Sequence, residues 1–175
     1  MTFTETQLPG VWRIDLKKVE DDRGYFARTW CAEAFRAHGL DPTLVQCNTS
    51  FNRKRGTLRG MHYQADPHWE PKLVRCTRGA IYDVALDLRS GPNFGKWIAV
   101  ELNANNGRML YLPRGVAHGF QTLEDESEVF YQMGVEYHAE SARGIRWNDP
   151  AFQIDWPITQ AILSPKDAAY PNYAC

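Results

Sequence analysis

The sequence lacks the features of exported, membrane-embedded and disulfide-rich proteins. Its four cysteines, Cys31, Cys47, Cys76 and Cys175, are spaced like neither a zinc ribbon nor a redox pair. No apolar run approaches the roughly 20 residues that cross a bilayer, and the first ten residues show neither the basic start nor the apolar stretch of a signal peptide. These absences predict reduced thiols, a cytoplasmic location and no membrane partner.

An excess of positive charge is also absent. Lysine and arginine number 20 against 21 acidic residues, which gives a formal net charge of −1. Domains that bind nucleic acid usually carry a basic excess or a basic stripe, and the one short basic cluster here is Arg53-Lys54-Arg55. We therefore expect no nucleic-acid partner.

Short apolar runs broken by Gly, Pro and Asn predict a mainly β fold. The length of 175 residues favours one domain, residues 1–175, with a single substantial core. Turn signals such as Gly91-Pro92 and Asn105-Asn106-Gly107 separate the runs, which favours an antiparallel sandwich or small barrel. The expected strands are Leu73–Thr77, Ala80–Leu88, Trp97–Leu102, Met109–Leu112, His118–Thr122 and Glu128–Met133.

Helices are expected to be few and short. One helix is predicted with Thr29 as its N-cap, apolar positions that include Phe35, and an end at Gly39. His38, at the end of this helix, is expected to be structural. The C-terminal part predicts ordered extended chain, because its prolines leave little room for long helices; they are Pro150, Pro157, Pro165 and Pro171.

The spacing of Gly107, Pro113, Gly115 and His118 resembles the second sequence motif of cupin barrels. This resemblance implies a cupin-type double-stranded β-helix, or jelly-roll, barrel. In metal cupins the histidine at the position of His118 binds the metal, and most other ligands come from a His-x-His pair in the first motif.

The first cupin motif is incomplete in this chain. The corresponding stretch is His62-Tyr63-Gln64, so glutamine replaces the second histidine. Divalent metals of this kind need three or four nitrogen or carboxylate ligands. Two histidines fall short unless His68 or Glu70 contributes, and the expectation is a barrel without a metal.

Seven short segments match one family in the same order and at similar separations. They are Asp22–Phe26, Val45–Asn48, Leu58–Gln64, Lys72–Arg75, Gly115–Phe120, Trp147–Pro150 and Leu163–Asp167. Each alone is a weak signal, but together they make the chain resemble the dTDP-4-dehydrorhamnose 3,5-epimerase family across nearly its whole length. The resemblance implies a homodimeric enzyme without a metal or other cofactor, which inverts C3, C5 or both of a nucleotide-linked 4-keto-6-deoxyhexose.

The chemistry of such a reaction sets its own requirements. A ketone at C4 acidifies the hydrogens on C3 and C5, because the resulting anion delocalises onto oxygen as an enolate. Removal of a carbon-bound proton near neutral pH needs a base with a matching pKa, which favours histidine. It also needs a positive or hydrogen-bonding group at the enolate oxygen and an acid on the opposite face of the ring.

The resemblance supplies a residue for each of these catalytic roles. His62 is the base, Asp167 orients it and stabilises its imidazolium, Lys72 stabilises the enolate, and Tyr131 is the opposing acid. Without the resemblance, Tyr131 would be interpreted as a half-buried strand tyrosine and Lys72 as a solvated lysine at a strand edge. Asp167 would pass for part of a surface turn.

The resemblance also implies a set of substrate-binding residues. Arg23 and Arg59 match arginines that contact the diphosphate, and a guanidinium suits phosphate oxygens, although each alone could be a surface charge. His118 is expected to form a hydrogen bond in the sugar pocket, with a structural role at a strand end as the alternative. The remaining matches are Phe26, Gln46 and Asn48 at the nucleoside and Tyr137 at the sugar-diphosphate end.

Arg28 departs from the family pattern. The family usually has a glutamate here that helps to read thymine. A carboxylate accepts a hydrogen bond from thymine N3–H, whereas arginine can only donate. The hypothesis is that the base is read differently, or is not thymine.

Two other functions remain open from the sequence. One is a metal-dependent cupin dioxygenase or isomerase, and the other is a sugar-nucleotide-binding module without catalysis. The complete set of His62, Lys72, Tyr131 and Asp167 argues against the second. The nucleotide, the sugar pathway and the number of inverted centres are not determined by the sequence.

Overall fold

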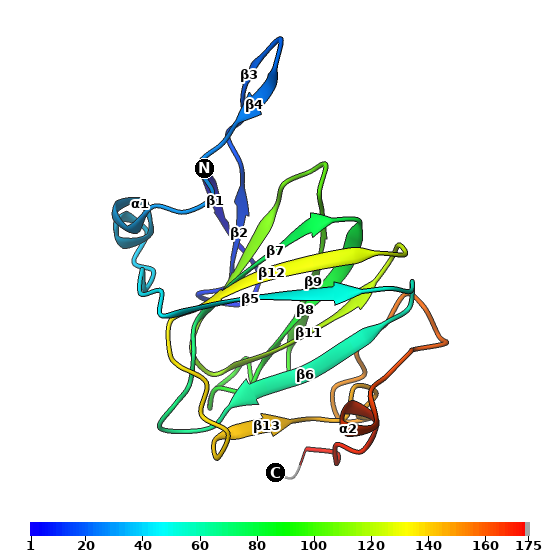
Figure 1. Ribbon diagram of the computed structural model, residues 1–175. Coiled ribbons are helices and arrows are strands. Elements are labelled where there is room, and N and C mark those ends of the chain that lie inside the picture. The colour runs from blue at the N-terminus through cyan, green and yellow to red at the C-terminus, as the bar shows by residue number, and fades with distance from the viewer. Residues whose placement is uncertain (174–175) are drawn as a thin grey trace.

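Antiparallel strands from most of the chain form two facing sheets (Figure 1). The computed structural model describes residues 1–173. The strands of the six-stranded sheet, in spatial order, are β1 (Thr2–Glu5), β2 (Trp12–Asp15), β10 (Met109–Leu112), β7 (Lys72–Arg78), β12 (Ser127–Met133) and β5 (Gln46–Asn52). Those of the five-stranded sheet are β13 (Ala142–Gly144), β6 (Leu58–Gln64), β11 (Val116–Thr122), β8 (Ala80–Asp87) and β9 (Trp97–Asn103). The prediction of a mainly β fold is confirmed, and each of the six predicted strands is present.

The main core lies between the two sheets. Along β7, Val74 and Cys76 belong to this core, while Leu73 packs on the outer face of the same sheet. Because side chains alternate along a strand, Lys72 faces the same interior as Val74. On β12, Val129 lies in the core and Tyr131 packs against it. The interior is therefore apolar over part of its length and polar where Lys72 and Tyr131 lie.

The outer face of the five-stranded sheet is also covered. Residues from the C-terminal part, including Ile145, Phe152 and Trp156, pack with Val84 and Leu86 of β8 in a second apolar cluster. This second layer explains why β8 is apolar on both faces, as its imperfect alternation predicts. The same C-terminal part carries the short helix α2 (Pro165–Ala168), and the prediction of little helix in this part is confirmed.

The predicted N-terminal helix exists, but it is shorter than expected. Helix α1 spans Ala32–Ala37, its N-cap is Cys31, and no side chain caps it. The predicted Thr29 cap is wrong, because Thr29 lies too far ahead of the first helical N–H groups for its hydroxyl to accept from them. Phe35 of α1 packs on the outer face of the six-stranded sheet, and His38 stacks on Phe3 with ring centroids 4.0 Å apart, as a structural histidine would.

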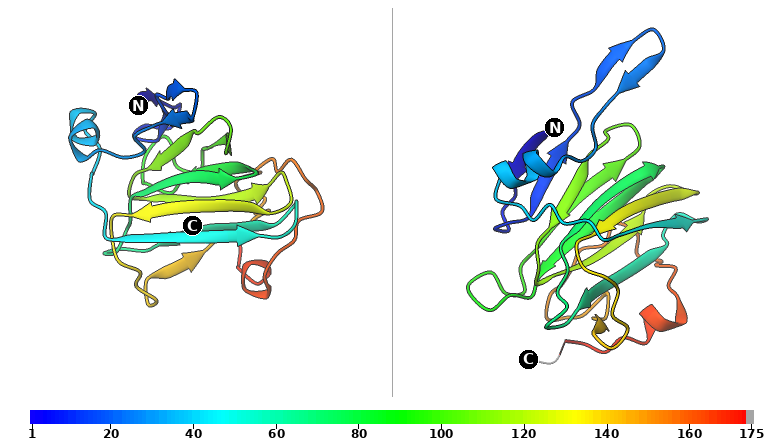
Figure 2. Two further views of the ribbon diagram at one scale, coloured as in Figure 1. Left: turned by 45° about the horizontal axis from the view of Figure 1, so that its top comes forward. Right: turned by 60° about the vertical axis from the view of Figure 1, so that its left-hand side comes forward.

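One hairpin stands away from both sheets. Strands β3 (Val19–Asp21) and β4 (Gly24–Phe26) pair only with each other, and they project beyond the body of the molecule in Figure 1 and in the right-hand view of Figure 2. Val19, Tyr25 and Phe26 are exposed on this hairpin. Neither helix of the described chain is long and apolar enough to span a membrane.

Candidate active site

A histidine and an aspartate that are far apart in sequence form a close pair at the polar end of the barrel. His62 Nε2 and Asp167 Oδ1 lie 2.6 Å apart. His62 comes from β6, where it pairs with His118 of β11 and Gly144 of β13. A carboxylate can only accept a hydrogen bond, so the pair places the shared proton on Nε2 and leaves Nδ1 as the nitrogen that can take another proton.

Local sequence fixes the position of Asp167. Ser164 is the N-cap of α2, and its Oγ accepts a hydrogen bond from the backbone N–H of Asp167 at 3.0 Å. Pro165 occupies the start of the helix, where its missing N–H costs nothing. Burial alone would raise the pKa of Asp167, but the hydrogen bond and charge of His62, together with Ser164 and Arg59, hold it below its usual value. The carboxylate is therefore ionised at neutral pH.

Lys72 is a buried cation with a buried partner. Its Nζ lies 2.6 Å from Oε1 of Glu70, and both side chains are at most 10% exposed. The expectation of a solvated lysine at a strand edge is thus wrong, because β7 is an interior strand of its sheet. The ammonium lies where a negative charge developing in the polar end of the barrel would be stabilised.

Tyr131 faces the same interior from β12. Burial is the main cause that raises the pKa of its phenol, the negative charge of Glu70 adds to the effect, and the positive charge of Arg59 opposes it. The phenol is therefore protonated at neutral pH and can donate a proton.

Two adjoining cavities meet at the predicted catalytic residues. Each has a volume of about 350 Å³. His62, Lys72, Tyr131 and Arg59 line both cavities, so the predicted base, acid and enolate stabiliser share one space. Asp167 lines the second cavity, beside α2.

His118 lines the first cavity and is held by a second buried carboxylate. Its Nε2 lies 2.7 Å from Oδ1 of Asp83, which is fully buried on β8. His118 thus lines the cavity that holds the predicted catalytic residues, and its orientation is fixed by Asp83. Arg59 is oriented in a similar way, since its Nε donates to Asn52 Oδ1 at 2.8 Å.

Three predicted substrate-binding residues lie along the second cavity. Gln46 and Asn48, both on β5, are joined by a 3.2 Å hydrogen bond from Gln46 Nε2 to Asn48 Oδ1. Gln46 Oε1 also accepts from the backbone N–H of Tyr137 at 3.2 Å. Tyr137 is 55% exposed at the rim of this cavity, where its ring is free to contact a ligand.

The other three predicted substrate-binding residues lie outside these cavities in the single chain. Arg23 is on the projecting hairpin, with its side chain 89% exposed and paired with Asp21. Phe26 on the same hairpin is 72% exposed. Arg28 lies at the base of the hairpin, in a separate depression with Val19 and Phe26. A single chain therefore does not assemble the whole predicted site.

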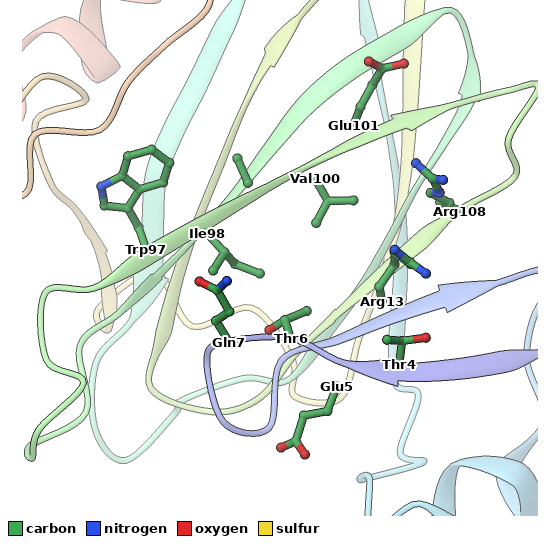
Figure 3. Close-up of a pocket in the computed structure, with 11 residues that line it drawn as sticks. Thr4, Glu5, Thr6, Gln7, Arg13, Trp97, Ile98, Val100, Glu101 and Arg108 are labelled. Carbon is green, nitrogen blue, oxygen red and sulfur yellow. The ribbon is translucent and has the colours of Figure 1, made fainter.

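A larger cavity lies elsewhere, between the β1–β2 region and β9 (Figure 3). Its volume is about 700 Å³, and its lining includes Gln7, Arg13, Trp97 and Glu101. None of the predicted catalytic side chains reaches it. Size alone would therefore select a cavity without a histidine base or a tyrosine acid.

The described residues around His62 and His118 do not supply the three or four ligands of a cupin metal centre. His62 and His118 each direct Nε2 at a carboxylate, and Glu70 is paired with Lys72. His68 instead stacks on His138, with ring centroids 3.6 Å apart. Within residues 1–173, the one group of three candidate metal ligands is His68, His138 and Glu140. Neither His68 nor Glu70 thus completes a ligand set around His62 and His118.

Two buried acids of the site were not predicted in these positions. Asp83 lies in the middle of the mostly apolar strand β8, and an acid at such a position is a signal of a buried pair. The sequence presents Glu70 only as a candidate metal ligand. Its position two residues before Lys72 is the signal for their pairing, because side chains two apart on extended chain point to the same side.

Comparisons with known proteins identify the family of this chain. Residues 5–174 match the family model of dTDP-4-dehydrorhamnose 3,5-epimerase. The dTDP-4-dehydrorhamnose 3,5-epimerase of Sinorhizobium fredii is 44% identical over 174 residues, which are 98% of this chain and 89% of the relative. The Bacillus anthracis enzyme, solved with TDP and PPi bound, has a TM-score of 0.95 at 37% identity and covers 98% of this chain and 99% of its own.

A further solved structure carries a sugar nucleotide. The Legionella pneumophila epimerase in complex with dTDP-4-keto-L-rhamnose has a TM-score of 0.92 at 37% identity, with 98% of this chain and 92% of that chain covered. The predicted cupin-type barrel and the predicted carbohydrate epimerase class are confirmed by these relatives. The chain belongs to the dTDP-4-dehydrorhamnose 3,5-epimerase family.

Proposed function

We propose that this chain inverts C3 and C5 of a dTDP-linked 4-keto-6-deoxyhexose in deoxysugar biosynthesis, with His62 as base and Tyr131 as acid. The observation that carries these roles is that His62, Lys72 and Tyr131 line the same two cavities, with Asp167 bonded to the imidazole. Proton transfer beside an existing ketone requires no redox step, so no cofactor is proposed.

The first step removes a proton from the carbon next to the ketone. His62 takes the proton on Nδ1, the C–H electron pair forms a carbon–carbon double bond, and the carbonyl electrons move onto oxygen. The ammonium of Lys72 stabilises the enolate oxygen, and the ionised carboxylate of Asp167 stabilises the new imidazolium.

The second step returns a proton to the opposite face of the ring. Tyr131 donates its phenolic proton to the carbon, the carbonyl re-forms, and the configuration at that carbon is inverted. His62 is then protonated and Tyr131 is deprotonated, so proton exchange with solvent restores the starting state. The same pair acts in turn on the second carbon.

Family membership supports a thymidine nucleotide, but Arg28 indicates that the base is read without the usual carboxylate. Arg59 in the cavities, with Gln46 and Asn48 on β5, provides donors and acceptors for the diphosphate and the nucleoside. Titration with thymidine, cytidine, guanosine and uridine diphosphates tests the choice of base. A clear preference for thymidine diphosphate supports the proposal and contradicts the alternative that the base is not thymine.

The active unit in this proposal is a homodimer. The projecting hairpin exposes Val19, Tyr25 and Phe26, and Arg23 and Phe26 lie on it, away from the cavities of their own chain. A second copy would bury the apolar hairpin residues and would let Arg23 and Phe26 reach the cavities of the partner. Sedimentation of the purified protein tests the dimer directly.

The proposed location is the cytoplasm. Among the described cysteines, Cys31, Cys47 and Cys76 are free thiols, which suits a reducing compartment. The fourth, Cys175, lies outside the described residues. Fractionation of cells that express the native chain tests this assignment.

Proton NMR of a 4-keto-6-deoxyhexose nucleotide incubated with the enzyme in deuterated water tests the reaction. The wild-type chain is expected to replace the hydrogens at C3 and C5 with deuterium and to invert both centres. His62→Asn is expected to abolish the exchange while the fold remains, because this side chain is 40% exposed. His38→Gln, outside the site, is the matched control. A wild-type chain that binds the nucleotide without exchange would be a binding module.

A further inference from the structure

Glu70 is a further buried carboxylate that contacts one of the proposed catalytic groups. Asp167 holds His62, and in the same way Glu70 holds Lys72 with a separation of 2.6 Å between Oε1 and Nζ. Only 5% of the Glu70 side chain is exposed. A buried ammonium without a partner is costly and free to change position, so this contact fixes where the positive charge lies.

The backbone that carries Glu70 and Lys72 is itself anchored. Pro71, between them, restricts φ, and its carbonyl accepts a hydrogen bond from the N–H of Gly134 at 3.0 Å. Lys72 pairs with Met133 of β12 and with Leu112 of β10. The two charged side chains therefore extend from a backbone segment that hydrogen bonds hold on both sides.

The second oxygen of Glu70 has no partner. Oε2 is buried and lacks a hydrogen bond within the described residues, although most buried polar atoms have one. Glu70 lines the second cavity beside Lys72, Tyr131 and His62. A bound substrate that donates a hydrogen bond to Oε2 would explain why this oxygen has no partner in the protein. A 4-keto-6-deoxyhexose has hydroxyl groups at C2 and C3 that can do so.

We propose that Glu70 is a positioning residue of this site: Oε1 fixes the ammonium of Lys72 at the enolate, and Oε2 accepts a hydrogen bond from a hydroxyl of the bound sugar. This inference rests on the proposed function, since it concerns the same reaction. It adds a sugar-binding group that is independent of the diphosphate contacts.

The charge of Glu70 has a further effect in this site. It adds to the burial that raises the pKa of Tyr131, and so favours the protonated phenol that the reaction needs. The basic side chains that line the same cavities and oppose this effect are Arg59, Lys72, Arg143 and Lys166.

Steady-state kinetics of Glu70→Ala in the wild-type and Lys72→Ala backgrounds test the two parts of the proposal separately. In the wild-type background, kcat is expected to fall about 10- to 100-fold, the effect of losing a hydrogen bond to a charged group. KM is expected to rise about 3- to 10-fold from the lost sugar contact. In the Lys72→Ala background, kcat should not fall further, whereas the rise in KM should persist.

Two further variants of Glu70 separate the loss of its hydrogen bonds from a general effect on folding. Glu70→Gln retains an oxygen that can accept from Lys72, so its loss of kcat should be smaller than that of Glu70→Ala. If Glu70→Ala does not fold, Glu70→Leu fills the same space and is measured in its place.

A separate experimental result would contradict each part of the proposal. An unchanged kcat in Glu70→Ala, or an equal loss in the Lys72→Ala background, overturns the positioning of Lys72. An unchanged KM overturns the sugar contact. A wild-type chain without exchange at C3 and C5 contradicts the proposed function itself. If the wild-type chain exchanges these hydrogens and Glu70→Ala has the same kcat and KM, only this inference is contradicted.

Discussion

His62 Nε2 lies 2.6 Å from Asp167 Oδ1, although 105 positions separate the two residues. β6 supplies the histidine from the sheet, and helix α2 supplies the aspartate from the C-terminal layer. The contact therefore couples the catalytic geometry to the packing of the chain beyond residue 145 on the outer face of the five-stranded sheet. The orientation of the His62 imidazole therefore depends on the packing of this C-terminal part of the chain.

Asp167→Asn is expected to lower kcat/KM about 10- to 100-fold, because the imidazolium loses a charged acceptor. Helix α2 should remain, since the contact to Ser164 uses the backbone N–H of residue 167. Deuterium exchange measured by proton NMR provides the rate. Asp155→Asn, an exposed position of the same C-terminal part, should match the wild type. Full activity of Asp167→Asn would remove the carboxylate from the reaction.

Tyr131→Phe is expected to separate exchange from inversion. His62 would still remove the proton, so deuterium should enter the sugar, but donation to the opposite face should fall about 100-fold or more. NMR of the product reports both the deuterium content and the configuration. Tyr82→Phe is the matched control, because Tyr82 is a half-buried strand tyrosine that packs outside the site. Full epimerisation by Tyr131→Phe would show that another group is the acid.

The strands that could be predicted from sequence are those with buried faces. β7 to β12 carry regular apolar residues, and their predicted bounds differ from the observed ones by at most two residues. β5 and β6 had no prediction, because Gln46, Asn48, Arg59 and His62 place polar groups where a core strand would have apolar ones. Periodicity thus misses β5 and β6, whereas β7, β11 and β12, which also line the site, are predicted because their other positions are apolar.

The candidate site was predicted through its motifs rather than through its geometry. Resemblance located His62, Lys72, Tyr131 and Asp167, and the structure brings these four together. Motifs do not report which ionic partner a side chain has, so the pairs of Glu70 with Lys72 and Asp83 with His118 required coordinates. Arg23 and Phe26 illustrate a different limit, since a single chain does not place them in its own cavities.

Cys76 is expected to resist alkylation in the native protein. It is 3% exposed within the core between the sheets, and burial raises the pKa of its thiol to about 11. At pH 8 the reactive thiolate is then only about one part in a thousand. Iodoacetamide labelling followed by peptide mass spectrometry, before and after unfolding, checks this expectation. Labelling of Cys76 in the folded protein would contradict the packing of β7.

Mixed dimers test whether the hairpin works in the partner's site. A His62→Asn chain has an intact hairpin but no base, and a chain with Arg23→Ala and Phe26→Ala has the base but an impaired hairpin. Each variant alone should be nearly inactive in the exchange assay. When the two are unfolded and refolded together, the hairpin of the first chain can complete the site of the second.

Random pairing makes half of the mixed population heterodimers, and each of these has one complete site out of two. The expected activity is therefore about one quarter of that of the wild type. A hairpin that folds back onto its own chain gives no recovery, because no chain in the mixture then has both an intact base and an intact hairpin. Recovery near one quarter would place Arg23 and Phe26 across the interface, whereas its absence in confirmed heterodimers would contradict the shared site.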